Sequence, residues 1–233
     1  MAKKRVKRTP AELTGKLLFF TLIISALYSL VRIVIPKPLF SDGTVYAHVR
    51  SDYVLMFIQC LLGLGVLSLP SVMARKWKFT IPNFIYIMYY IFLYCAIFLG
   101  EVLNFYYVIP HWDVILHFFS GAMLGALGFI LVSQLNDSDM IRVSLSPFFV
   151  ALFAFCFALS CGAVWEVYEF VFDGLLGLNM QKFITATGEV LVGHAALHDT
   201  MTDVIVDALA ALLISIIGYS RLKADKWFSK TKE

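Results

Sequence analysis

The sequence predicts an all-α protein, a polytopic bundle of six transmembrane helices. Of its 233 residues, 60% are hydrophobic and only 15% are charged, and the mean hydropathy is +0.81. The apolar residues fall into six runs of about 20 residues, the length that crosses the hydrocarbon core of a bilayer. A soluble domain is about a quarter charged and cannot bury this much apolar surface in one core. The composition therefore excludes an ordinary soluble enzyme and a disordered chain.

The runs define one membrane domain, residues 17–220, between a basic tail at residues 1–16 and a second basic tail at residues 221–233. The six predicted spans are Leu17–Ile35, Tyr53–Val72, Pro82–Leu103, Trp112–Ser133, Leu145–Phe172 and Asp199–Tyr219. Short segments with Pro, Gly, Asn, Asp or basic residues separate most of them. The exception is the segment 173–198, which is long, mildly apolar and rich in glycine. We expect an interfacial or re-entrant cap there.

The distribution of Lys and Arg predicts the orientation of the bundle. Fifteen of these residues lie on the side of the two termini and three on the other side, with Arg32 inside the first span. By the positive-inside rule, both termini are cytoplasmic. The net charge of +3 is modest, and the basic residues lie at the chain ends and in short loops. We therefore expect the lipid bilayer as a partner and no nucleic acid; the oligomeric state stays open.

Acidic and histidine residues gather at one end of three predicted helices. They are Asp113 and His117, then Glu166 and Glu169, then Asp199, Asp203 and Asp207. Spacings of three and four residues place each set on one helix face. At 1.5 Å per residue, the last set reaches about 12 Å along its helix. We expect the three sets to converge in the outer half of the bilayer.

These acids need a counter-charge. Asp203 and Asp207 are flanked by apolar residues, and an Asp at the centre of a membrane helix costs about 2.5–3.5 kcal/mol. Both must face the interior of the bundle. Basic residues on that side are few: Lys37, Arg50 and Lys182, besides Arg32. Two explanations remain, carboxyl groups that share protons or a bound divalent metal.

In the metal interpretation, the candidate ligands are His117, Glu166, Glu169, Asp199 and Asp203. A histidine among carboxylates suits Zn²⁺, Mn²⁺ or Fe²⁺, whereas carboxylates alone suit Mg²⁺ or Ca²⁺. Asp207 or Asp113 would then be the catalytic base. The alternatives are structural: Asp113 and Asp199 as helix caps, and His117 in a buried hydrogen bond.

The three sets of residues also carry a family resemblance. Asp113-x-x-x-His117, Glu166-Val-Tyr168-Glu169 and Asp199-Thr200-x-x-Asp203 resemble, in this order, motifs of the YjdF-like bacterial integral-membrane proteins. The resemblance covers about residues 105–215. The position of Tyr168 departs from the family pattern, in which the tyrosine precedes the first acid, so Glu169 matches better than Glu166. The family has no assigned reaction, so the resemblance implies a bacterial plasma-membrane location and a shared polar centre.

Three functions fit these observations. The first is a metal-dependent enzyme that acts on a lipid or a lipid-linked envelope substrate. The second is a carrier of protons or divalent cations, since intramembrane acids often line ion paths. The inner halves of the predicted helices offer little beyond serines, which argues against a path across the whole bilayer. The third is a non-catalytic sensor or scaffold whose polar cluster only joins helices.

Overall fold

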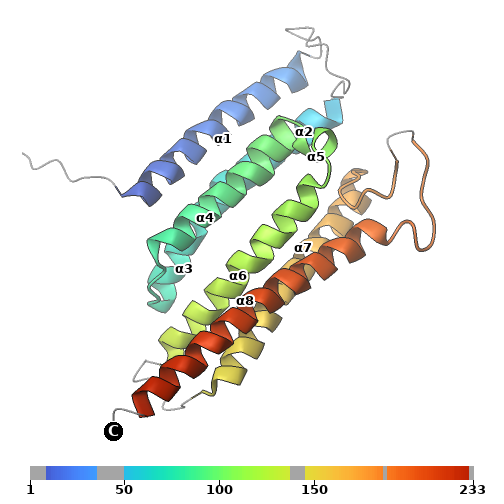
Figure 1. The fold of residues 1–233 in the computed structure, drawn as a ribbon. Coiled ribbons are helices and arrows are strands. Elements are labelled where there is room, and N and C mark those ends of the chain that lie inside the picture. The colour runs from blue at the N-terminus through green and yellow to red at the C-terminus, as the bar shows by residue number, and fades with distance from the viewer. Residues whose placement is uncertain (1–8, 36–49, 137–144, 186–187, 231–233) are drawn as a thin grey trace, which may run out of the picture. The chain divides into compact units, whose positions relative to one another are not determined.

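The computed structural model describes residues 9–35, 50–136, 145–185 and 188–230 (Figure 1). Residues 1–8, half of the predicted N-terminal tail, lie outside these residues, as do Lys37 and Arg142. The elements are α1 (Pro10–Val34), α2 (Arg50–Val66), α3 (Leu69–Trp77), α4 (Asn83–Leu93), the π-helix η1 (Tyr94–Val102), α5 (Phe105–Val108), α6 (Trp112–Asn136), α7 (Pro147–Leu176) and α8 (His198–Lys230).

The predicted fold class is confirmed. Among the described residues, six helical segments are long and apolar enough to cross a membrane: Pro10–Val34, Asp52–Trp77, Asn83–Val102, Trp112–Leu135, Pro147–Leu176 and His198–Ala224. The second segment joins α2 and α3 across a short turn, and the third joins α4 and η1. The described residues contain no strand, only an isolated antiparallel bridge between Ile184 and Val190.

Several predicted spans are shorter than the helices that contain them. The first helix begins at Pro10 and not at Leu17, because the Thr9 side chain caps it by accepting a hydrogen bond from the Glu12 amide at 3.3 Å. Proline suits a first helical position, where no intrahelical partner for an N–H exists. The last helix continues past Tyr219 to Lys230 and takes in much of the predicted C-terminal tail. Hydropathy marks the membrane-spanning part of a helix, whereas polar ends extend beyond it.

The chain divides into two compact units, residues 1–112 and 113–233. In the first unit, α1 packs against α2 and α4 through a buried apolar cluster of Leu18, Leu22, Ala26, Cys60 and Leu93. The buried Arg32 donates a hydrogen bond to the Tyr53 hydroxyl at 2.8 Å, and Gln59 donates one to Glu101 at 3.0 Å. These two hydrogen bonds link α1 to α2 and α2 to η1.

In the second unit, glycines bring α6 close to both neighbours. A Cβ on Gly121 would lie 3.0 Å from the backbone oxygen of Asp207 on α8, and one on Gly128 would lie 2.9 Å from the Cα of Ala154 on α7. Small residues allow this close approach of helix backbones in membranes. Gly121 and Gly128 therefore serve the packing of α6 against α8 and α7. The close approach brings polar side chains of all three helices within reach of one another.

The segment between α7 and α8 is anchored to the end of α7. Helix α7 extends to Leu176, a little beyond its predicted end, and closes at Gly177 with φ +65°. Just before this cap, the Asp173 carboxylate accepts hydrogen bonds from the amides of Met180 and Gln181 at 2.8 and 3.0 Å. Gln181 also donates to the Thr200 hydroxyl on α8 at 2.8 Å. The beginning of this segment is therefore tied to α7 through Asp173 and to α8 through Thr200.

Candidate metal centre

All the predicted site residues lie in the second unit, on three helices. Asp113 and His117 occupy the first turns of α6, Glu166 and Glu169 the last third of α7, and Asp199, Asp203 and Asp207 the first turns of α8. His117, Glu166, Glu169, Asp203 and Asp207 are buried. The side chains of Asp113 and Asp199 are 12% and 23% exposed and form the more open side of the group.

His117 lies between the carboxylates of α6, α7 and α8. Its Nδ1 lies 3.1 Å from Oδ2 of Asp207. Its Nε2 lies 3.8 Å from Oδ1 of Asp113 and 3.7 Å from Oε1 of Glu166. The first distance is a hydrogen bond and the other two are too long for one. Donor atoms that share an ion at about 2.1 Å each lie about 3–4 Å apart, so the Nε2 side has the spacing of a ligand set.

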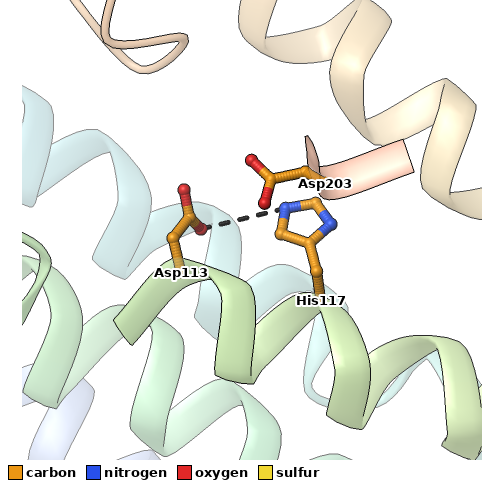
Figure 2. Close-up of side chains that lie close together, drawn as sticks. All are labelled: Asp113, His117 and Asp203. Carbon is orange, nitrogen blue, oxygen red and sulfur yellow. Dashed lines mark ion pairs between the residues drawn. The ribbon is translucent and has the colours of Figure 1, made fainter. Parts of the chain in front are cut away.

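Two overlapping groups of three residues have ligand atoms close enough to hold one ion. One group is Asp113, His117 and Asp203, shown in Figure 2, and the other is His117, Glu166 and Glu169; within each, the ligand atoms lie within 4.8 Å of one another. Figure 2 shows the Asp113 and Asp203 carboxylates on the same side of the imidazole, one from α6 and one from α8. The fold thus brings together four of the five predicted metal ligands.

Several carboxylate oxygens in the cluster have no hydrogen bond within the described part of the chain. Both oxygens of Asp203 are in this state, as are Oδ1 of Asp207 and Oε2 of Glu169. Asp203 is only 1% exposed. Because a buried ionised carboxylate without a partner costs several kcal/mol, these oxygens call for a cation or for protons. Among the described residues, Asp203 and Glu166 are the two buried acids with both oxygens in this state, and Asp203 is the less exposed of the two.

Lys182 is the cation at the open side of the cluster, and sequence reasoning missed its role. Its ammonium lies 2.6 Å from Oδ2 of Asp113 and 2.8 Å from Oδ1 of Asp199. From the sequence alone, Lys182 is only one of the few basic residues expected on the outer side. Its position in the sequence gives no periodic signal, because the described residues of the segment 177–197 are not helical. A single lysine in a glycine-rich connection between two acid-bearing helices was the only available hint.

The surroundings of Lys182 stabilise its charged form. Burial alone would lower the pKa of this amine, but the charge of Asp113 and the hydrogen bonds to Asp113 and Asp199 outweigh it. The pKa of Lys182 is therefore raised above its ordinary value of about 10.4. Asp113 and Asp199 both lie in the first turns of their helices. Their side chains form ion pairs with Lys182. The alternative that they act as helix caps did not predict these ion pairs.

Two further contacts hold the acids in place. Trp165 donates its indole N–H to Oε1 of Glu169 at 2.9 Å, one helical turn along α7. Asp207 packs against Gly162 so closely that a Cβ at that glycine would overlap the Asp207 carboxylate. Gly162 therefore provides the space in which Asp207 reaches His117.

Residues 39–224 match the model of a family described as "Predicted membrane protein (DUF2238)". The match includes parts of both units and every predicted site residue. The chain belongs to this family. The description supports a membrane protein and assigns no reaction, in agreement with the coarser part of the resemblance drawn from the motifs. The more specific YjdF-like assignment stays a prediction.

A relative from Thermotoga maritima, an uncharacterized protein, is 31% identical over 132 residues. The matched region is 56% of this chain, and the chain spans 58% of the length of that relative. No solved structure matches the chain. The assignment of a function to this family member therefore rests on the chemistry of the cluster itself.

Proposed function

We propose that this family member is a metal-dependent membrane enzyme whose divalent ion is bound by His117 and surrounding carboxylates. The ligands are drawn from Asp113, Glu166, Glu169 and Asp203, with Asp199 at the open side. Asp207 acts through His117. The ion lowers the pKa of a bound water or polarises a carbonyl or phosphoryl oxygen of the substrate.

The observation that carries the proposal is the state of Asp203. Its carboxylate is 1% exposed, and neither oxygen has a hydrogen bond among the described residues. It lies beside the imidazole of His117 (Figure 2). Shared protons would also lower the charge of such a group. The metal is favoured because His117 binds Asp207 through Nδ1 and directs Nε2 at the other acids, the arrangement typical of metal-bound histidines.

The types of ligand atom limit which divalent metals suit the cluster. One imidazole nitrogen among carboxylate oxygens suits Mn²⁺, Fe²⁺ or Zn²⁺, whereas Mg²⁺ and Ca²⁺ prefer oxygen alone. Where the protein supplies only part of the coordination shell of Mn²⁺, Fe²⁺ or Zn²⁺, the remaining coordination position is free for water or substrate. Such a ligand would enter at the open side of the cluster, beside the Lys182 ammonium that lies between Asp113 and Asp199.

The substrate is a lipid or a lipid-linked molecule of the cell envelope. Three membrane-length helices bear the cluster. The α7 residues next to its acids are apolar and exposed, namely Val164, Val167 and Phe170. A substrate that approaches through the bilayer meets this surface, whereas a water-soluble one does not. The asymmetry of Lys and Arg supports an outer-leaflet site in the bacterial plasma membrane, with both termini cytoplasmic.

The proposal is tested by the metal content and lipid chemistry of the full-length protein. Purified in detergent, the wild type should carry a stoichiometric divalent metal, and Asp203→Asn should lose it while it remains monodisperse. Asn keeps the shape of Asp and removes the charge. Glu189→Gln, at an exposed acid of the same unit, is the matched control and should retain the metal.

The second measurement addresses catalysis. Metal-loaded protein is reconstituted into vesicles of bacterial lipid extract, and the lipids are followed by mass spectrometry. A change in lipid species with the wild type and none with Asp203→Asn supports an enzyme. Metal-free wild-type protein, with Asp203→Asn more stable to heat, would reject the metal centre in favour of shared protons. Bound metal without any change in lipid would reject the enzyme in favour of a carrier or sensor.

A further inference from the structure

The position of Lys182 suggests a second cation site in the same cluster. We infer that the Lys182 ammonium occupies the place of a second divalent ion, so that removing the amine turns a one-ion centre into a two-ion centre. The inference rests on the proposed function for the first ion. It identifies a second cation-binding position, which the Lys182 ammonium occupies in the wild type.

The Asp113 carboxylate has the geometry of a bridging ligand. Its Oδ1 faces Nε2 of His117 at 3.8 Å, and its Oδ2 contacts the Lys182 ammonium at 2.6 Å. One carboxylate thus joins the proposed metal position to the position of the ammonium. A carboxylate that contributes one oxygen to each of two cations is the usual bridge in two-metal sites, whose ions lie about 3.5–4 Å apart.

Asp199 completes the second position. Its Oδ1 contacts the ammonium at 2.8 Å, and its Oδ2 is buried without a hydrogen bond in the described part of the chain. Asp113 and Asp199 therefore offer a cation two oxygens in contact and a third nearby. Lys182 has a side chain that is 36% exposed, so waters would fill the remaining coordination of an ion that replaces the amine. This oxygen-rich set suits Mn²⁺ or Mg²⁺.

Lys182 is held at this position in an unfavourable backbone conformation. Lys182 has φ +49°, a left-handed backbone conformation that is unfavourable for a residue with a side chain. The neighbouring amides of Met180 and Gln181 are held by Asp173, and the Gln181 side chain by Thr200. Strained backbone persists where the surrounding contacts over-determine it. These contacts direct the ammonium between two carboxylates, where it neutralises charge without taking up metal.

The test counts bound Mn²⁺ on full-length protein that has been stripped with a chelator. Isothermal titration and electron paramagnetic resonance are used with the wild type, Lys182→Met and Lys182→Arg. The wild type and Lys182→Arg should bind one Mn²⁺, because each keeps a fixed cation between the two acids. Lys182→Met has a similar shape without the charge and should bind two, with the exchange-coupled spectrum of a carboxylate-bridged pair.

A double variant locates the additional ion. Lys182→Met combined with Asp199→Asn should return to one Mn²⁺, because the new position loses a ligand. A single Mn²⁺ in folded Lys182→Met, with wild-type affinity, overturns the inference. If Lys182→Met does not stay monodisperse, Lys182→Gln is measured in the same way and decides by the same count.

The result also separates this inference from the proposed function. A wild type without Mn²⁺, together with one Mn²⁺ in Lys182→Met that Asp199→Asn abolishes, would reject the proposed metal centre and support the second position. One Mn²⁺ in both the wild type and Lys182→Met would support the proposed metal centre and reject the second position. No Mn²⁺ in either protein would reject both.

Discussion

His117 and Asp207 form a buried hydrogen bond between α6 and α8, with Nδ1 and Oδ2 3.1 Å apart. Asp207 is 1% exposed and His117 is 5% exposed. A carboxylate at this position accepts the proton of Nδ1 and leaves the lone pair of Nε2 facing Asp113 and Glu166. The contact therefore sets which nitrogen can bind a metal. It favours a positioning role for Asp207 over the predicted role of a catalytic base, since the carboxylate lies on the far side of the ring.

The first prediction concerns this hydrogen bond. In Asp207→Asn, the amide can donate to Nδ1 and shift the proton of His117 to Nε2. Because Nε2–H cannot bind a metal, the affinity for Mn²⁺ or Zn²⁺ should fall about 10–100-fold, the usual effect of losing such a partner. Competition with a fluorescent chelator measures the affinity. Ser215→Ala, at a buried polar residue two turns further along α8, should bind metal like the wild type; equal affinities in all three proteins would contradict the positioning role.

The second prediction concerns the space that Gly162 leaves for Asp207. In Gly162→Ala, the new methyl group overlaps the Asp207 carboxylate and must push it away from His117. We expect a loss of about 1–3 kcal/mol in the free energy of unfolding, the usual cost of an overpacked core, together with weaker metal binding. Thermal unfolding in detergent and metal titration measure the two effects.

Gly174 provides the control for this change. It lies on the same helix, and a Cβ there would meet nothing within 4 Å. Gly174→Ala should leave metal binding unchanged and leave the stability equal or up to about 1 kcal/mol higher, since alanine favours the helix. Similar losses in both variants would show that helix α7 is sensitive to any added methyl group and would refute the specific role of Gly162.

A third prediction addresses the indole that holds Glu169. Trp165→Phe removes the hydrogen bond to Oε1 but keeps an aromatic ring, which stacks on Tyr168 at 4.9 Å in the wild type. We expect the unfolding free energy to fall by about 0.5–1.5 kcal/mol and metal affinity to fall about tenfold, because Glu169 loses its orientation. Trp77→Phe, at an exposed tryptophan at the end of α3, should change neither quantity. Unchanged metal affinity in Trp165→Phe would exclude Glu169 as an oriented ligand.

The fourth prediction concerns topology. The excess of Lys and Arg on the side of the termini predicts that a reporter fused after Glu233 is active only in its cytoplasmic form. A cysteine introduced by Glu189→Cys, in the segment between α7 and α8, should react with a membrane-impermeant maleimide added outside the cell. The wild type gives the background from the four native cysteines. Labelling of Glu189→Cys only after the cells are opened would invert the orientation.

From the sequence alone follow the fold class and the acidic and histidine residues of the candidate site, but not Lys182. Hydropathy determines which segments enter a bilayer, because each span must be apolar over about 20 residues. Helical periodicity then places acids three or four residues apart on one face, as with Glu166 and Glu169. The same periodicity indicates that Asp203 and Asp207 turn inward, since lipid excludes them.

How those side chains meet depends on the tertiary structure. The sequence gives no sign that His117 divides its two nitrogens between Asp207 and the other acids, because that depends on the distance between helix axes, which Gly121 and Gly162 set. It gives even less indication of Lys182. The path of the chain around Lys182 depends on non-periodic contacts of Met180 with Asp173 and of Gln181 with Thr200. Only this path places the ammonium between Asp113 and Asp199.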